Sequence, residues 1–403
     1  MSKEVPVIIA GAGPVGMVAA ADLVRRGIPV TVCEKMNSLS LESRASTFHP
    51  PTLDMLDDLG FAEPLMAQGL VAPTVQYSST ADGELGTFNF SAISDLTRHP
   101  YRVQSEQFKL TRIILDRLKD NPLFTIRFGA PIVSISQDTE GVDIGLQADG
   151  GTQRHRCRWL IGADGANSIV RRAQDIEFDG FTWPERFLVI TTSFDFASAR
   201  PGVSSVSYVA DPVRWHFLLR IVGAWRVMMP VATEKSDEEA TSDAYIQESM
   251  RRVLPPGADF DVQHVTLYRV HQRVAKSFRL GRTFLAGDAA HINNPLGGMG
   301  MNGGIHDALN LSKRLGRVIL GEAGEAALDS YDLQRRTVTL EAIQGDTIRN
   351  KRNLEARDEN DRRQFRDQIR EAAADPEKGR ALLRRIAMFD SLERAASLEP
   401  EKV

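Results

Sequence analysis

The first 34 residues carry the pattern that most constrains the fold of this chain. Val5–Ala10 is a continuous apolar run, which is typical of a buried parallel strand. The glycine turn Gly11-Ala-Gly-Pro-Val-Gly16 follows, then a predicted helix from Pro14 to Arg26, then a second predicted strand, Pro29–Cys33, which ends at Glu34. Strand, glycine turn, helix, strand and acid together form the full context of the dinucleotide-binding fingerprint.

This unit predicts a site for an adenine dinucleotide. Gly11, Gly13 and Gly16 would let the pyrophosphate approach the helix N-terminus, and Pro14 suits the first helical turn, where no N–H is needed. Glu34 follows Gly16 at about the 20-residue spacing that the fingerprint expects. An acid at this position favours FAD or NAD over NADP. The alternative is a tight strand–helix turn without a ligand.

A second informative segment runs from Gly281 to Leu311. Its pattern predicts a strand over Arg282–Ala286, an acidic turn at Gly287–Asp288, a glycine-rich loop and a helix. A carboxylate at a strand end can accept hydrogen bonds from sugar-like hydroxyls, and the glycines let backbone N–H groups approach a ligand closely. The stretch Gly298-Met-Gly-Met-Asn-Gly303 also matches the fingerprint, but no strand directly precedes it and no strand ending in an acid follows the helix. The sequence therefore predicts one dinucleotide site.

Composition narrows the class of protein. A chain of 403 residues with 42% hydrophobic residues favours two interleaved domains, and a net charge of −4 gives no sign of a nucleic-acid partner. No apolar run approaches the ~20 residues of a membrane span. Cys33 and Cys157 are interpreted as buried free thiols in a reducing cytoplasm. The eight histidines show no ligand spacing, so no metal is expected.

The rest of the chain predicts a mixed region followed by helices. A helix is expected over Gln107–Leu118 and a β-hairpin within Ser204–Val231, with its turn at Gly223. From Arg349 onward the sequence is charged and helical, with breaks at Asp375-Pro376 and Gly379, and is interpreted as a solvated face rather than a binding surface. Further predicted strands cover Phe124–Arg127, Ile132–Ser136, Val142–Leu146 and Arg156–Ile161.

Three segments together carry a family resemblance: Gly11–Gly16 with Glu34, Gly162–Arg171, and Gly287–Gly304. In this order they resemble the single-component FAD-dependent aromatic hydroxylases, the para-hydroxybenzoate hydroxylase-like flavoprotein monooxygenases, whose DG and GD motifs the last two segments match. The resemblance covers roughly residues 5–340.

The resemblance implies an α/β fold with interleaved domains. A Rossmann-like FAD-binding domain of the GR2 type would comprise residues 1–75, 100–177 and 272–345. A mixed β-sheet substrate domain would comprise residues 76–99 and 178–271, and residues 346–403 would form a C-terminal helical segment.

The resemblance also implies roles for individual residues toward FAD. Gly11, Gly13, Pro14 and Gly16 would hold the pyrophosphate, Glu34 and the adjacent Lys35 the adenosine ribose, and Arg44 and Gln104 the pyrophosphate and ribityl region. Asp164 belongs to the motif that contacts FAD and NAD(P)H, and Asp288 would bind the ribityl chain. Gly300, Met301 and Asn302 would present backbone to the flavin ring, and Pro295 would line the pocket of oxygen chemistry. The alternatives are a surface ion pair for Arg44 and a helix cap for Gln104.

The activity implied by the resemblance is aromatic hydroxylation. NAD(P)H would reduce FAD, and a flavin C4a-hydroperoxide would transfer oxygen from O2 to an aromatic or heteroaromatic, phenolic or carboxylated molecule. The alternatives are a related flavoenzyme that epoxidises or tailors a polyketide or quinone, and a non-catalytic flavin-binding protein. The substrate, the choice between NADH and NADPH, and the oligomeric state, with a homodimer as one alternative, stay open.

Strand alternation predicts how the hairpin presents its side chains. The alternation assigns one apolar face to the core and a second face to the substrate. The core face would comprise Trp215, Phe217, Leu219 and Ile221, and the second face Arg214, His216, Leu218 and Arg220, with Arg226 and Met228.

Tyr208 is predicted to meet a ring hydroxyl, and Arg220 or Arg226 an anionic substituent; His216 is a further catalytic candidate on that face. The alternative is a half-buried tyrosine beside exposed charges. No tyrosine follows Tyr331. Because 4-hydroxybenzoate enzymes use a second, C-terminal tyrosine, this absence argues against 4-hydroxybenzoate as the substrate. His291 is expected to hold the loop after Asp288 rather than to act in catalysis.

Overall fold

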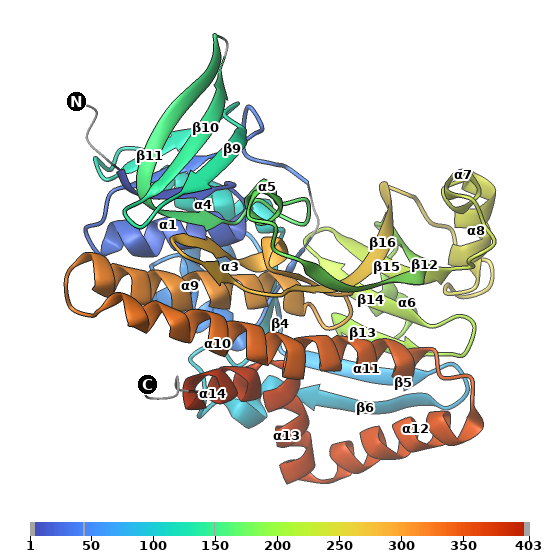
Figure 1. Ribbon diagram of the computed structural model, residues 1–403. Coiled ribbons are helices and arrows are strands. Elements are labelled where there is room, and N and C mark those ends of the chain that lie inside the picture. The colour runs from blue at the N-terminus through green and yellow to red at the C-terminus, as the bar shows by residue number, and fades with distance from the viewer. Residues whose placement is uncertain (1–4, 43–44, 149, 399–403) are drawn as a thin grey trace.

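The computed structural model describes residues 5–42, 45–148 and 150–398, and within them the chain forms three sheets and a set of helices (Figure 1). Arg44 lies outside the described residues, so its predicted role stays a prediction. None of the described helices combines the length and apolar character that crossing a bilayer requires.

The first sheet contains the predicted strand–helix–strand unit. Its strands follow the order β17-β18-β11-β1-β2-β8, and β10 and β9 extend it from β11. The neighbours β18, β11, β1, β2 and β8 are parallel, which agrees with their continuous apolar character. The bounds are β1 Val5–Ala10, β2 Val30–Cys33, β8 Phe124–Arg127, β9 Ile132–Gln137, β10 Val142–Ala148, β11 Gly151–Gly162, β17 Arg279–Leu280 and β18 Thr283–Leu285.

Helices α1 (Pro14–Arg25), α4 (Gln107–Leu118) and α9 (Met299–Ile319) pack together beside this sheet. Small residues allow α9 and the turn after β18 to approach α1. A Cβ on Gly304 would lie 2.6 Å from Val15 Cγ2, and one on Gly287 would lie 2.8 Å from the same atom. The two segments that carry the glycine motifs, far apart in sequence, are therefore held against each other.

The second sheet has the order β19-β16-β12-β15-β14-β13-β5-β6. One face packs against the C-terminal helices and the segment Phe90–Ile93. The other face packs against α7 (Asp237–Ala240) and α8 (Asp243–Arg251) (Figure 1). The bounds are β5 Thr74–Ser79, β6 Gly83–Asn89, β12 Phe178–Thr192, β13 Val206–Ala210, β14 His216–Ile221, β15 Ala224–Val231, β16 His264–Ala275 and β19 His291–Ile292.

A small third sheet has the strand order β3-β7-β4. It consists of β3 (Thr47–Phe48), β7 (Arg102–Gln104) and β4 (Leu70–Ala72), all antiparallel pairs. Helix α2 (Pro50–Asp58) follows β3, and the short helices α3 (Ala62–Met66) and η1 (Phe90–Ile93) lie between these strands in the sequence.

The C-terminal third is helical, and of the two predicted breaks one is confirmed and one is wrong. The break at Asp375-Pro376 is confirmed, because α12 (Glu359–Ala374) ends there and α13 (Pro376–Ile386) begins. The predicted break at Gly379 is wrong. Gly379 lies inside α13, where a Cβ would sit 2.8 Å from Ala372 O, so glycine serves close packing there. The other helices are α10 (Asp329–Val338), α11 (Gly345–Leu354) and α14 (Phe389–Ser397), and α10 and α11 are joined by the π-helical turn η4 (Thr339–Gln344).

The predicted domain limits can be compared with these sheets. Residue 178 begins β12, whereas residues 76 and 272 fall inside β5 and β16. The division into interleaved domains stays a prediction, with limits better placed at strand ends.

Candidate active site

The first glycine turn forms a cradle in which each glycine has a different reason to be small. Gly11 has φ +99°, and a Cβ there would lie 2.4 Å from Ala163 O. A Cβ on Gly16 would lie 2.1 Å from Gly11 O, so Gly16 allows the helix to pack on the turn. A Cβ on Gly13 would meet no atom of the surrounding described residues within 4 Å, which leaves room for a ligand above the N-terminus of α1.

Glu34 ties the end of β2 to this turn. Its carboxylate accepts hydrogen bonds from Ala12 N at 2.8 Å and Met36 N at 2.9 Å, one on each oxygen. Each oxygen keeps a further lone pair that can accept from a ribose hydroxyl. The adjacent Lys35 is exposed and can reach a ligand only from the surface.

Two acidic residues lie near the ends of the neighbouring strands β11 and β18. Asp164 Oδ2 accepts from Ile169 N at 2.7 Å and Val170 N at 3.2 Å at the start of α5 (Ile169–Ala173), while its Oδ1 is buried without a partner among the described residues. Asp288 is exposed. The preceding residue is fixed, because Gly287 N donates to Asp307 Oδ2 at 3.1 Å.

The hydrogen bond to Gly287 belongs to a buried charge cluster that the sequence did not reveal. Asp307 Oδ2 lies 2.7 Å from His291 Nε2, and Asp307 Oδ1 lies 2.7 Å from Arg335 Nε, with all three side chains at most 1% exposed. Burial alone would raise the pKa of Asp307, but His291 and Arg335 hold it below its usual range. His291 thus holds the turn around Asp288, which agrees with the role expected for it.

Gln104 is buried on β7, and only the oxygen of its side-chain amide forms a hydrogen bond within the described residues. Its Oε1 accepts from Thr47 Oγ1 at 2.7 Å, and its Nε2 has no partner among the described residues. This free N–H group fits the ribityl or ring oxygens expected for it, and its contact with Thr47 is not the helix cap of the alternative interpretation.

The loop before α9 is held by β16 and α11 through Asn294. Asn294 is fully buried; its N and Nδ2 donate to Gln272 Oε1 at 3.0 and 3.3 Å, and its Nδ2 also donates to Thr347 O at 2.9 Å. These bonds explain why the loop carries an amide there. Pro295 is exposed at the tip, and Gly300 lies in the first turn of α9.

Asn302 uses its side chain for the loop and for β3. Its Nδ2 donates to Thr47 O at 2.9 Å and Gly298 O at 2.6 Å, and its Oδ1 accepts from His49 N at 2.9 Å. The predicted backbone contacts of Gly300, Met301 and Asn302 with a flavin ring stay predictions. Through its side-chain hydrogen bonds, Asn302 fixes the end of that loop to β3 and to the start of α2.

Side chains of β14 alternate between the two faces as predicted, but the prediction that Arg226 and Met228 share a face with Arg220 is wrong. Register pairs Leu219 with Arg226 and Phe217 with both Met228 and Tyr208. Directly opposite residues share a face of a sheet. The two-residue turn at Val222-Gly223 places odd-numbered residues of β14 opposite even-numbered residues of β15. Arg226 therefore lies on the face that carries Leu219 and Phe217, and Tyr208, opposite Phe217, lies on the same face.

Arg220 and His216 consequently lie on the opposite face. The Arg220 guanidinium stacks over Trp225 at 5.8 Å, and His216 Nδ1 lies 3.1 Å from Arg214 O in a buried setting. Burial lowers the pKa of His216 to about 4. The structure does not bring Arg220 or His216 together with Tyr208, so we leave both out of the candidate site.

Arg226 and Tyr208 reach the residue before β3 and the loop before α9. Arg226 Nη1 donates to Ser46 Oγ at 2.9 Å, immediately before β3. Tyr208 is buried and stacks on Tyr77 at 5.2 Å. Burial raises the pKa of Tyr208, while the Arg102 guanidinium and the Gly297 backbone oppose that rise. The tyrosine hydroxyl therefore lies close to the glycine loop before α9.

Two residues of this region were missed by sequence reasoning. His49 Nε2 lies 3.0 Å from Gly297 O, and Arg102 is 1% exposed. The position of Arg102, two residues before Gln104 in the same strand, was the only available signal, because alternation places both side chains on one face.

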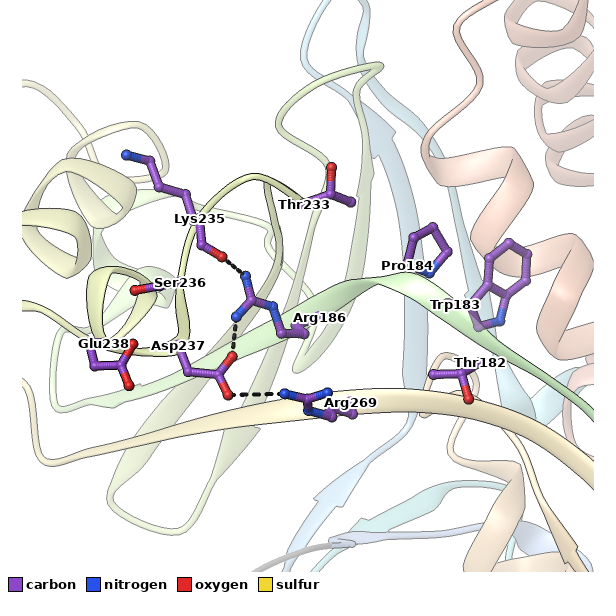
Figure 2. Close-up of a pocket in the computed structure, with 10 residues that line it drawn as sticks. All are labelled: Thr182, Trp183, Pro184, Arg186, Thr233, Lys235, Ser236, Asp237, Glu238 and Arg269. Atoms are coloured by element: carbon purple, nitrogen blue, oxygen red, sulfur yellow. Dashed lines mark hydrogen bonds and ion pairs between the residues drawn. The ribbon is translucent and has the colours of Figure 1, made fainter.

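A separate open cavity of about 460 Å³ lies on the other face of the second sheet (Figure 2). Its arginines already have partners: Arg186 binds Asp237 and Lys235 O, and Arg269 Nη2 lies 3.4 Å from Asp237 Oδ2. Since Tyr208 and Arg226 point away from it, we do not assign this cavity to the reaction.

These observations fit FAD. The open space at Gly13, the exposed Asp288, and two buried atoms without a partner in the described part of the chain, Gln104 Nε2 and Asp164 Oδ1, all lie on the elements expected to hold it. Gly11, Gly13 and Gly16 would hold the pyrophosphate, Glu34 the ribose, and Asp288 and Gln104 the ribityl side.

Comparisons with known proteins agree with this fit. The model of the FAD binding domain family matches residues 4–346. The para-nitrophenol 4-monooxygenase of Pseudomonas strain WBC-3 is 37% identical over 341 residues, 83% of each chain. The 6-hydroxy-3-succinoylpyridine 3-monooxygenase of Pseudomonas putida is 33% identical over 88% of this chain and 90% of that protein. The crystal structure of p-nitrophenol 4-monooxygenase from Pseudomonas putida superposes with a TM-score of 0.91 at 30% identity, covering 100% of both chains.

With a family match over most of its length, relatives that are named monooxygenases and a cradle that fits the cofactor, the chain belongs to the FAD-binding family of flavoprotein aromatic hydroxylases, and it is an FAD-dependent monooxygenase.

Proposed function

We propose that this enzyme uses NAD(P)H and O2 to hydroxylate a small, single-ring phenol. The observation that most supports this proposal is that Tyr208 and Arg226 lie on the same face of the second sheet. On this face Arg226 contacts Ser46, directly before β3, and Tyr208 lies beside Gly297, in the loop before α9. A ring held on this face would lie against the loop before α9.

Each residue has a defined part in this proposal. FAD, when bound, supplies the oxygen-transfer chemistry. The Tyr208 hydroxyl orients the phenolic oxygen, and Arg226 meets an anionic or strongly polar substituent on the ring. Pro295 and the buried Leu296 border the ring, and the sheet excludes water from it.

The substrate class follows from the space and from the relatives. Tyr77 and Phe217, with centroids 5.2 and 4.7 Å from Tyr208, fill one end of the face with aromatic rings, which favours one ring over a fused polycycle. The relatives that match most of their own length act on para-nitrophenol and on a hydroxypyridine. We propose p-nitrophenol as the first substrate to test; polyketide or quinone tailoring is the disfavoured alternative.

The purified enzyme, loaded with FAD, tests this directly. NADH and NADPH oxidation should accelerate at least tenfold with p-nitrophenol and not with a polycyclic quinone, with a hydroxylated product found by mass spectrometry. Arg226→Met should raise the KM for p-nitrophenol at least tenfold. The matched variant Arg220→Met, on the opposite face, should leave KM unchanged. Equal effects of the two variants, or ligand-independent NAD(P)H oxidation, would refute the proposal.

We also propose that the protein acts in the cytoplasm, where NAD(P)H is available. Cys33 is a buried free thiol, which supports a reducing compartment.

A further inference from the structure

Arg102 is a buried cation without a carboxylate partner in the part of the chain that the structure describes. Its side chain is among the largest that are less than 2% exposed. Nη2 donates to Ile386 O at 3.0 Å, Nε has no partner, and the guanidinium lies 5.3 Å from the centroid of Phe90. A buried charge is expensive unless it is paired.

The surroundings of Arg102 do not supply the missing negative charge. His49, directly before α2, and Tyr208, on β13, face it. Burial and Arg102 both lower the pKa of His49, which keeps that ring neutral. Beyond Tyr77, from β5, lie Arg349 of α11 and Arg385 of α13. The acid there, Asp346, pairs with Arg349 and lies 4.0 Å from Arg385.

Capping of α13 explains only part of this arrangement. Ile386 is the last residue of α13, and a cation is favourable at a helix C-terminus. The Ile386 carbonyl and the Tyr208 hydroxyl, however, use only two of the five N–H donors of the guanidinium. Arg102 is also only 1% exposed, so its remaining N–H groups are not in contact with bulk water.

We infer that Arg102 recognises the ionised oxygen of the phenol substrate, which it holds beside the Tyr208 hydroxyl under Gly297. The phenol then binds as its anion and leaves its proton in solution. The oxyanion neutralises the buried guanidinium, and Tyr208 donates the second hydrogen bond. An electron-rich phenolate is also the form of the ring that an electrophilic oxygen attacks most readily. This inference rests on the proposed function for its substrate class.

The ionisation of bound p-nitrophenol tests the inference, because its anion and its neutral form absorb at different wavelengths. The FAD-loaded enzyme is titrated with p-nitrophenol without NAD(P)H, one pH unit below the pKa of the free phenol, and difference spectra are recorded. Wild-type enzyme should bind the anion. Arg102→Met should bind the neutral form at least tenfold more weakly, and Arg102→Lys should retain the anion. Arg226→Met should weaken binding but keep the anion spectrum.

Flavin content and the unfolding midpoint establish that each variant is folded. Binding of p-nitroanisole to the wild-type enzyme also tests whether the ionised oxygen is recognised, because this compound has the same ring but cannot ionise. Wild type should bind it at least 100-fold more weakly than p-nitrophenol. Binding of neutral p-nitrophenol by wild type, or an anion spectrum lost in Arg226→Met and kept in Arg102→Met, overturns the inference. If the anion binds but no hydroxylated product forms on adding NAD(P)H and O2, the proposed function fails while the role of Arg102 stands.

Discussion

Gly13 and Gly16 belong to the same turn but are small for different reasons. Gly13 has φ −69° and ψ 176°, which any residue adopts, and a Cβ there meets no atom of the surrounding described residues. A Cβ on Gly16 would collide with Gly11 O. We predict that Gly13→Val lowers FAD affinity at least tenfold with little change in the unfolding midpoint of the apoprotein, because it fills space reserved for the ligand. Gly16→Ala should lower that midpoint itself. FAD titration and thermal unfolding of the apoproteins measure both effects.

Loss of apoprotein stability in Gly13→Val, or full FAD affinity in that variant, would contradict the assignment of this space to the pyrophosphate.

Among single residues, the sequence predicted local backbone positions better than strand pairing, and the roles of these residues toward FAD stay predictions. Glu34 and Gln104 lie where the fingerprint and the resemblance place them, since short motifs determine local backbone. Arg226 was assigned to the wrong face, because hairpin parity depends on the length of the turn. His49 and Arg102 went unnoticed, because their meeting depends on tertiary packing of β3, β7 and α13.

At the scale of elements, Asp307 joins α9 to α10 and to the turn after β18. We predict that Asp307→Asn lowers the free energy of unfolding at pH 7 by about 3 to 5 kcal/mol, because it leaves Arg335 buried without a counter-charge. The pKa of Asp307 is lowered on folding, so its contribution is present above its unfolded pKa of about 3.9 and is lost as the pH falls further. Urea unfolding of wild type and variant should therefore differ most near neutral pH and converge in acid.

A difference between the two proteins that stays constant from pH 7 down to pH 3 would exclude an ionic role for Asp307.

The helices α12 and α13 present an apolar face to β6 and η1 and a charged face to solvent (Figure 1). We predict that Leu383→Ala, at 1% exposure, lowers the free energy of unfolding by about 2 to 5 kcal/mol through the cavity that it leaves. Arg380→Ala removes the exposed ion pair with Asp95 and should leave the unfolding midpoint essentially unchanged.

Chemical denaturation of both variants compares them directly. If Arg380→Ala strongly lowered the free energy of unfolding and Leu383→Ala hardly changed it, the charged face rather than the apolar face would hold these helices in place.

Elements with a strong local signal were predicted closely. The bounds of α4 and β8 agree with the prediction, and the glycine-rich match before α9 is not a second dinucleotide unit. The π-helical turn η4 was not predicted, because no local pattern encodes it. Within it Gln344 Nε2 donates to Ile292 O at 3.1 Å, and the turn takes its form from packing against the loop before α9.

At the scale of the whole molecule, buried histidines predict sensitivity to mild acid. Burial lowers the pKa of His216 to about 4 and that of His306 to about 3, and also lowers that of His49. A lowered folded pKa means that the unfolded chain takes up more protons below about pH 6.5, so stability is complete above that pH and falls below it. We predict that the free energy of unfolding decreases between pH 6.5 and 5, by up to about 1.4 kcal/mol per pH unit for each histidine.

Urea unfolding at closely spaced pH values measures how the free energy of unfolding changes with pH. His306→Gln should reduce that slope by up to about 1.4 kcal/mol per pH unit, which corresponds to one proton. A flat profile between pH 7 and 5 would mean that these rings are hydrated in solution.

The architecture of the whole molecule was accessible from the sequence only through the resemblance. Local patterns identify strands and helices but do not order them, so the pairing of β13 with β5, about 130 residues apart, needed the structure. The same holds for the return of the C-terminal helices over β5 and β6 (Figure 1). A homodimer stays a prediction.

The central claim is that FAD held in the Gly11–Gly16 cradle directs oxygen to a phenol on the Tyr208–Arg226 face. Turnover of p-nitrophenol with NAD(P)H under ¹⁸O2, followed by mass spectrometry, tests it most directly. We expect one ¹⁸O atom in each hydroxylated product, and at p-nitrophenol concentrations below the KM we expect less of that product from Arg226→Met but not from Arg220→Met. A product whose added oxygen comes from water, or NAD(P)H oxidation that yields only hydrogen peroxide with every phenol, would contradict it.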